Sequence, residues 1–313
     1  MKKIVLSVIA VLFCFFITAQ DGANLKLSME KNKLYRFRST SNQNLSQTVN
    51  GVLQTTNTSS NTVFSIKMVD ATNDFIIVEA RFDTVVINTN AMGKMVSMNS
   101  ASPGNMASSE AADVMSCIMN RLSKNVLYVK MDATGKVIDI VNFTMLSDIV
   151  LKDTASITGQ SAPVLKTQVK NTINVKALKS MIEAFTFNLP DKEVKNGEQW
   201  EINSPFNSGG MSLDIVTSYK LNDINNNNAH ITSESSIKAS VDAEPLEYSG
   251  ARITYDGLTG MGKSNLIIDS LTGLVIENNS KTHMAGDLNV SVQGMNLQIP
   301  MEIDGESKVV ALL

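Results

Sequence analysis

One stretch of the chain matches a nucleotide-binding pattern letter for letter. Residues 257–264 read GLTGMGKS, which fits G-x-x-x-x-G-K-[ST]. That motif works where a buried parallel strand leads, through glycine-rich backbone amides that wrap the phosphates, into a helix. Here the segment before it, 251–256, alternates polar and apolar residues, and the segment after it, 265–269, is again typical of a strand. The sequence therefore predicts a glycine-bent connection between strands, no bound nucleotide, and no phosphate partner for Lys263.

A run of methionines could bind a soft metal ion. Met92, Met95 and Met98 recur at every third residue, and Met106 follows. Thioether clusters select Cu(I) in oxidising compartments. The chain has 17 methionines spread along its length, however, and methionine is a good filler of irregular cores. Core packing is the favoured interpretation, and a Cu(I) site is kept as an alternative.

Residues that could catalyse a reaction are few. The chain has only two histidines, His230 and His283, and both fall in alternating, strand-like segments. No nucleophile elbow and no close spacing of metal ligands occurs. Cys117 falls on a predicted helix beside apolar residues, which favours a buried thiol over a nucleophile. We therefore predict a protein that is not an enzyme, without catalytic, cofactor-binding or metal residues, although carboxylates that converge in space would leave a hydrolase as a third alternative.

The first residues have the anatomy of an export signal. Lys2 and Lys3 precede an apolar run over 4–17, and small Ala19 offers a cleavage site. The alternative is a lipoprotein signal that uses Cys14, but bulky Phe13 stands before that cysteine. We predict cleavage near Ala19 and an exported protein of the periplasm or outer-membrane surface. Cys117 is then the single cysteine of the mature chain, so the fold must be held by packing.

Charge and composition exclude some partners. The formal charge is −3 and becomes more negative once Lys2 and Lys3 are removed, and no basic run stands out. Nothing in this balance attracts nucleic acid or an anionic lipid surface. Apolar residues make up 43% of the chain, which is enough for real cores.

The pattern of apolar residues predicts long strands around a helical middle. Strands are expected over 34–49, 52–69 and 75–82, the first two joined by Asn50-Gly51, a strong type I′ turn signal. A helix over 108–122, a hairpin over 126–140, a short helix near 145–151 and one longer helix from Pro163 to before Pro190 follow. Further strands are expected at 211–221, 229–241, 251–255, 265–268, 274–281, 287–292 and 295–303. Trp200 is expected to anchor the start of this last region.

Two segments echo each other. Residues 128–138 and 266–276 both lead from apolar residues through an aspartate and a turn glycine back to apolar residues, with Asp132 and Asp269 separated by close to half the mature chain. Duplication explains the echo, although such hairpins also recur by chance. The expected class is α+β, mainly antiparallel curved sheets in two related β-rich halves joined by amphipathic helices. The expected organisation is a signal at 1–19, a first half at 20–158, a helical connector at 159–190 and a second half at 191–313.

Several short motifs, in order, resemble one protein family. The motifs are the signal end Thr18-Ala19-Gln20, the segments 25–27 and 33–36, Leu189-Pro190, Gly197 to Trp200, and the hairpin 269–274. In this order they resemble DUF6263, a family of unknown function among exported proteins of Gram-negative bacteria. The resemblance implies a location and a general build, and it transfers no functional residue.

The predicted function follows from this build. Curved sheets packed on the helices of 108–187 could leave a concavity for an apolar ligand such as a lipid, with methionines as adaptable lining. The alternative is a structural or interaction module of the cell envelope that meets a partner protein through a sheet edge or face. No cofactor is expected.

Overall fold

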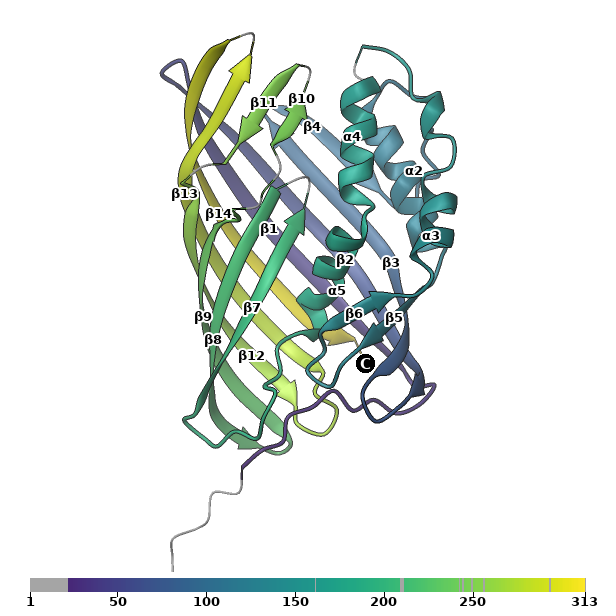
Figure 1. The fold of residues 1–313 in the computed structure, drawn as a ribbon, viewed down its shortest axis with the longest axis vertical. Helices are drawn as coiled ribbons and strands as arrows, with labels where there is room; N and C mark the ends of the chain where they lie inside the picture. Colours follow the sequence, from purple (N-terminus) through teal and green to yellow (C-terminus); the bar gives the residue numbers. More distant parts are fainter. Residues whose placement is uncertain are drawn as a thin grey trace, which may run out of the picture.

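The computed structural model describes residues 22–160, 162–208, 211–241, 243, 245–248, 250–255, 257–292 and 294–312. The predicted export signal, with Cys14, lies outside the described residues. Within them, one long antiparallel sheet curves around a group of helices, so the class predicted from the sequence, mainly antiparallel curved sheet with helices, is confirmed (Figure 1).

The first part of the sheet has three long strands followed by three short ones. They are β1 (Leu34–Val49), β2 (Val52–Ala71), β3 (Ile76–Ala91), β4 (Lys94–Asn99), β5 (Leu127–Met131) and β6 (Val137–Ile140). The strands after the helices are β7 (Gln199–Ser208), β8 (Met211–Asn225), β9 (Asn228–Ala239), β10 (Leu246–Tyr248), β11 (Ala251–Thr254), β12 (Thr259–Asp269), β13 (Val275–Val292) and β14 (Met295–Leu312). The main path runs β6-β5-β3-β2-β1-β14-β13-β12-β9-β8-β7.

Two related halves are not supported by this order. The first and last strands, β1 and β14, pair with each other over Arg36–Gln47, so the chain forms one continuous sheet. The two echoing hairpins also occupy unequal places, because β5–β6 lies at an edge of the sheet while β12–β13 lies within it. The two turns also differ in length: the Gly135 N–H donates to the Asp132 carbonyl three residues back, and the Gly273 N–H donates to the Asp269 carbonyl four residues back.

The helices cover part of the concave face of the sheet. They are α2 (Ala111–Ser123), α3 (Phe143–Val150), α4 (Ala162–Thr172) and α5 (Val175–Thr186). The helix predicted at 108–122 is confirmed as α2. The single long helix predicted from Pro163 is wrong, because the chain breaks it at Asn174, whose side chain accepts the Ala177 N–H at 2.9 Å and caps α5. The apolar residues keep their helical spacing across this break, so their spacing alone does not reveal that the helix ends there.

Helix α5 lies between the two edges of the main sheet path. On β7, the Asn207 N–H donates to Ser180 Oγ (3.1 Å), and the Ser180 hydroxyl donates to the Pro205 carbonyl (3.3 Å). On β6, the Val137 N–H donates to Glu183 Oε1 at 2.9 Å. Unpaired edge strands invite pairing with other chains, so covering them with a helix protects the sheet. Among the described residues the sheet stays open between its edge strands β6 and β7, and α5 contacts both of them.

An aromatic core fills the space between α5 and the sheet. Phe185 of α5 stacks on Phe64 of β2, with ring centroids 4.6 Å apart, and Phe64 contacts Phe82 of β3 at 5.2 Å. The segment after residue 22 crosses one end of this core, where Leu25, Leu27 and Met29 are buried. The Leu27 N–H donates to the Ala133 carbonyl, so the segment is held against the β5–β6 turn. The helix-covered part of the sheet is therefore a solid core.

Candidate functional site

The nucleotide-like motif lies within the sheet. Residues 259–264 belong to β12, which continues to Asp269 and pairs with both β9 and β13. Gly257 provides the turn before it, at a φ of 76°. Lys263 forms an ion pair with Glu234 of β9, at 2.9 Å. The prediction of strands in place of a strand–loop–helix motif is confirmed. The predicted glycine-bent connection is wrong for most of the motif, because Gly260 and Gly262 pair within β12 and only Gly257 and Leu258 precede that strand.

The methionine run does not gather into one cluster. Met92 lies in the β3–β4 turn, at a φ of 50°, and is 79% exposed. Met95 pairs with Asn90 and Met98 with Ile87 on the short strand β4, which the sequence pattern does not predict. Side chains three apart on a strand point to opposite faces, so Met95 is exposed while Met98 packs against the main core. Met106 is buried. The alternative Cu(I) site is therefore not supported by the positions of these residues.

The other residues singled out in the sequence have structural environments. Trp200 is 6% exposed, stacks on Tyr219, and donates from Nε1 to the Asn188 carbonyl at 3.3 Å. Burial raises the pKa of Tyr219 to about 12. Cys117 is a buried free thiol. His230 lies on β9 and His283 on β13, as the alternation predicted. The anchoring role predicted for Trp200 is confirmed.

The sheet has two distinct faces along its middle strands. On β1, Phe37 contacts Phe185 of α5 and so points to the concave, helix-bearing face. Side chains alternate along a strand, so Leu45, an even number of residues from Phe37, points to the same face. Asn44, next to Leu45 in the chain, points to the opposite face, which we call the outer face. The register Leu45↔Ile303 and Asn44↔Asp304 carries the same division to β14.

The outer face carries an open groove of about 1180 Å³ across β3, β2, β1, β14, β13 and β12. Most of the residues that line it are of polar types, and its asparagines are Asn42, Asn44, Asn57, Asn88, Asn90, Asn265 and Asn279. The charged residues along it are largely paired, since Lys281 contacts Glu306 at 2.7 Å and Lys308 contacts Glu277 at 3.0 Å. These side chains offer hydrogen-bond donors and acceptors to a polar partner.

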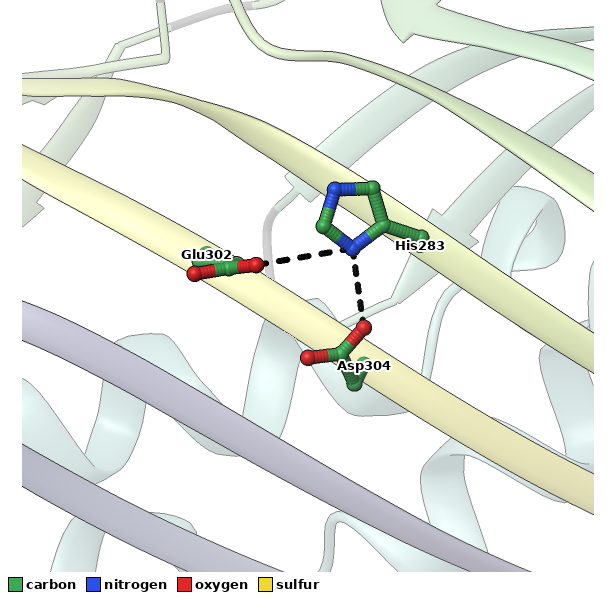
Figure 2. Close-up of side chains that lie close together, drawn as sticks. All are labelled: His283, Glu302 and Asp304. Carbon is green, nitrogen blue, oxygen red and sulfur yellow. Dashed lines mark hydrogen bonds and ion pairs between the residues drawn. The ribbon is translucent and has the colours of Figure 1, made fainter.

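Three side chains gather at one point on this outer face. His283 Nδ1 lies 2.8 Å from Asp304 Oδ1 and 3.7 Å from Glu302 Oε1 (Figure 2). The hydrogen bond with Asp304 raises the pKa of His283 above its ordinary 6.5, and partial desolvation opposes the rise. Glu302 and Asp304 are two apart on β14 and so share a face, and His283 is the register partner of Asp304 on β13. Sequence spacing gives no sign of this group, because antiparallel pairing alone brings the residues together.

The concave face has a polar band beyond the aromatic core. Serines of neighbouring strands hydrogen-bond to each other there: Ser41 with Ser60 at 2.8 Å, and Ser280 with Ser307 at 2.7 Å. Ser233 and Ser264 form a similar pair at 2.7 Å. These hydroxyls satisfy one another, so the band separates the helix-covered core from what lies farther along the strands.

A second apolar cluster lies beyond this band, and its described members come from strands and from the turn before β12, not from helices. Its buried members are Leu213, Ile237, Leu258, Met284, Met301 and Ile303. Leu258 reaches the sheet because Gly286 has no Cβ, which would lie 2.6 Å from the Leu258 Cα. From this cluster apolar side chains continue toward the β13–β14 turn on the same face, and we call this set the apolar wall. It consists of Leu45, Val49, Val52, Leu288, Val290, Val292, Met295, Leu297 and Ile299.

The apolar wall becomes more exposed toward its end. Ile299 is 8% exposed, Leu297 is 43% exposed and Met295 is 69% exposed. Val52, across the β1–β2 turn, is 62% exposed. Gln47 and Gln54 interrupt the wall on β1 and β2. Concave apolar surface with adaptable methionines and a few polar groups is typical of a site for an apolar ligand.

The sequence family is established by comparison. A family of unknown function (DUF6263) matches residues 73–275, and the chain belongs to this family. No curated protein matches the chain.

Among solved structures, the chain resembles part of lipovitellin, in a structure described as "Lipid-protein interactions in lipovitellin". The TM-score is 0.51 at 10% identity, over 91% of this chain and 25% of that one, so this chain spans about a quarter of the length of lipovitellin. This likeness concerns the fold alone.

The COG4313 outer membrane channel from Pseudomonas putida F1 has a TM-score of 0.27, at 8% identity over 93% of this chain and 99% of that one. The translocator domain of the autotransporter NalP from Neisseria meningitidis has a TM-score of 0.22, at 7% identity over 91% of this chain and 90% of that one. These two scores are too low to carry an argument. Among the described residues, no helix has both the length and the apolar composition needed to span a membrane.

Proposed function

We propose that this DUF6263 protein is a non-enzymatic, exported protein of the cell envelope that binds an apolar ligand, such as a lipid, along the apolar wall. The observation that carries the proposal is the continuation of apolar side chains past the helices on the concave face, where they become half-exposed. The ligand would not lie between the sheet and the helices, because the stacked Phe64 and Phe185 fill that space.

The wall favours an acyl chain on energetic grounds. Burying apolar surface stabilises a complex by about 25 cal/mol per Å², or about 0.8 kcal/mol for each methylene group removed from water. Leu297 and Met295 have apolar surface left to cover, and both lie on the concave face. An extended chain lying along β13 and β14 would cover both while its polar head stayed near Gln47 or Gln54, so the geometry suits an amphipathic ligand.

The likeness to lipovitellin supports the proposal in a limited way. That structure is described as one of lipid–protein interactions, and the two folds are similar over 91% of this chain. A shared fold does not fix a shared ligand, and the proposal rests on the wall itself.

The absence of enzymatic activity is also part of the proposal. Cys117 is buried in the helical core. His283 contacts two carboxylates and no hydroxyl or thiol nucleophile among the described residues. Acyl transfer or hydrolysis would require an activated nucleophile beside such a base, so these positions support a binding role.

A displacement assay tests the wall. The purified mature protein would be titrated with a fluorescent 16-carbon fatty acid, and Leu297→Asn would be compared with Leu53→Asn. Leu53 is 67% exposed on the β1–β2 hairpin, next to Val52 in the chain and therefore on the outer face, so it is a matched control.

We expect Leu297→Asn to weaken binding severalfold and Leu53→Asn to leave it unchanged. Probe that binds the two variants equally, or that fails to saturate the wild-type protein, would contradict binding at the wall.

The outer groove favours a second candidate function, an interaction module of the envelope. The groove is open, runs across six strands and is lined mostly by residues of polar types, which supports a partner protein that forms hydrogen bonds there. Cross-linking in the intact envelope from a residue introduced in place of Asn57 would identify such a partner. A specific protein adduct together with no bound small molecule would favour this function over the apolar ligand.

A further inference from the structure

We propose that His283, Glu302 and Asp304 form a binding site for a divalent transition-metal ion, with Zn²⁺ as the expected ion, on the outer face of the sheet. The site is separate from the apolar wall and does not depend on the proposed ligand. Each residue offers one ligand atom, and the three atoms lie within 4.8 Å of one another. One ion could therefore contact all three with small side-chain adjustments.

The sheet holds these ligands in place before any ion binds. β13 and β14 pair without a register shift from Glu277↔Val310 to Val292↔Met295, and His283 and Asp304 are direct partners within that ladder. Opposite residues on paired strands have Cβ atoms about 5 Å apart. Ligands on rigid central strands lose less conformational freedom on binding than ligands on loops.

A fourth polar group lies next to the three. Asn44 is the register partner of Asp304 on β1 and points to the same outer face. Its Oδ1 atom is buried and has no hydrogen-bond partner among the described residues. Buried polar atoms are nearly always hydrogen-bonded, so an orphaned oxygen on the residue paired with Asp304 is unusual. An amide oxygen is a suitable ligand for a hard or borderline cation, directly or through a water molecule.

The surrounding charges leave the site attractive to a cation. Lys281, two residues from His283 on the same face, contacts Glu306 at 2.7 Å, and Lys263 contacts Glu234 at 2.9 Å. The nearby ammonium groups are thus compensated by their own partners. The charge at the site is set by Glu302 and Asp304.

The donor set selects among metals. Imidazole nitrogen favours Zn²⁺ and other late transition ions, whereas Mg²⁺ and Ca²⁺ prefer oxygen ligands alone. One nitrogen and two carboxylate oxygens therefore favour Zn²⁺ over the alkaline-earth ions. Where Asn44 acts only through a water molecule, the three protein ligands leave a fourth position of a tetrahedral ion open, and His283 and Asp304 line the groove. A group of a molecule in the groove could occupy that position.

Isothermal titration tests the site directly. Tag-free mature protein, treated with a chelator and then dialysed, would be titrated with Zn²⁺, and native mass spectrometry would count the bound ions. The variants are His283→Gln and Asp304→Asn. The controls are His230→Gln, which removes the only other histidine, and Asp287→Asn, which removes an acid of the same face of β13.

We expect one Zn²⁺ per wild-type chain, a loss of affinity of at least about tenfold in both site variants, and wild-type affinity in both controls. We also expect little heat with Mg²⁺ at the same concentrations. Absence of a stoichiometric site in the wild-type protein would overturn the proposal, as would unchanged affinity in His283→Gln or an equal loss in His230→Gln. Fatty-acid binding by the site variants should match the wild type, so failure of this proposal is distinct from failure of the proposed function.

Discussion

At the scale of single residues, Glu183 accepts a backbone hydrogen bond in a place where burial disfavours its ionised form. Burial raises its pKa above the ordinary 4.5, and the hydrogen bond from Val137 and the charge of Lys136 oppose the rise. Its Oε1 atom accepts the free Val137 N–H of the edge strand β6. The residue therefore satisfies a backbone donor, but its ionised form is disfavoured by its surroundings.

This environment predicts a pH dependence. Between pH 4.5 and the raised pKa, the unfolded chain loses the Glu183 proton before the folded chain does. The folded state then binds more protons, so this residue lowers the free energy of unfolding as the pH rises through that window. Glu183→Gln keeps an oxygen for Val137 and cannot ionise.

We expect Glu183→Gln to be more stable than the wild type at pH 7 and equally stable below pH 4, as measured by urea unfolding followed by Trp200 fluorescence. A glutamine variant less stable than the wild type at pH 7 would show that the ionised carboxylate is favoured instead. Glu183→Ala, which leaves the Val137 N–H without its acceptor, should lose about 1–3 kcal/mol.

Lys263 offers a second test at this scale. Its exposed pair with Glu234 is worth little, because both side chains are more than two-thirds exposed. Lys263→Ala should leave the midpoint of thermal unfolding nearly unchanged, and ATP with Mg²⁺ should not shift it in either protein. A saturable shift with ATP that disappears in Lys263→Ala would mean that the motif binds phosphate after all.

At the scale of elements, α5 is the part that completes the sheet. Its Ser180 hydroxyl both donates to and accepts from the free edge of β7, and the residue is 6% exposed. Removing a buried partner leaves backbone groups unsatisfied, which costs about 1–3 kcal/mol. Ser180→Ala should therefore destabilise the protein by that amount and should speed hydrogen exchange of the Asn207 amide selectively.

Hydrogen exchange measured by mass spectrometry would resolve the β7 peptides. Thr167→Ala, which removes an exposed hydroxyl that bonds only within α4, is the matched control. Equal exchange of β7 in Ser180→Ala and in the control would show that α5 does not protect this edge.

The elements also show what the sequence can and cannot reveal. Hairpin strands were predictable where the turn is chemically marked: Asn50 and Gly51 have φ angles of 51° and 77°, as a type I′ turn requires. The β3–β4 turn adopts a similar conformation at Met92 and Gly93, but methionine at positive φ gives no such signal, so β4 was missed. The contacts of α5 with β6 and β7 could not be predicted, because they join segments that become neighbours only when the sheet curves.

The sequence did not predict the two candidate sites, for a related reason. Met284 and Ile303 face the concave side while His283 and Asp304 face outward, a division that alternation alone predicts for each strand. Which strands pair, and in which register, depends on the β1–β14 pairing between the two ends of the described chain. Neither the apolar wall nor the group around His283 can be recognised without that pairing.

At the scale of the whole molecule, one continuous sheet has two faces of different character. The concave face holds the solid core under the helices and, beyond the serine band, the apolar wall. The outer face holds the polar groove and the group of His283, Glu302 and Asp304. Export to the envelope, proposed from the first residues of the sequence, would place both faces where lipids and metal ions can be met.

The central claim is that the apolar wall holds a lipid, and native mass spectrometry tests it most directly. The protein would be extracted gently from the envelope of its source and sprayed intact, alongside Leu297→Asn prepared in the same way. We predict an additional mass of an acyl-chain lipid on the wild-type protein and a much smaller fraction of it on the variant. Wild-type protein that carries no lipid in repeated preparations would contradict the account.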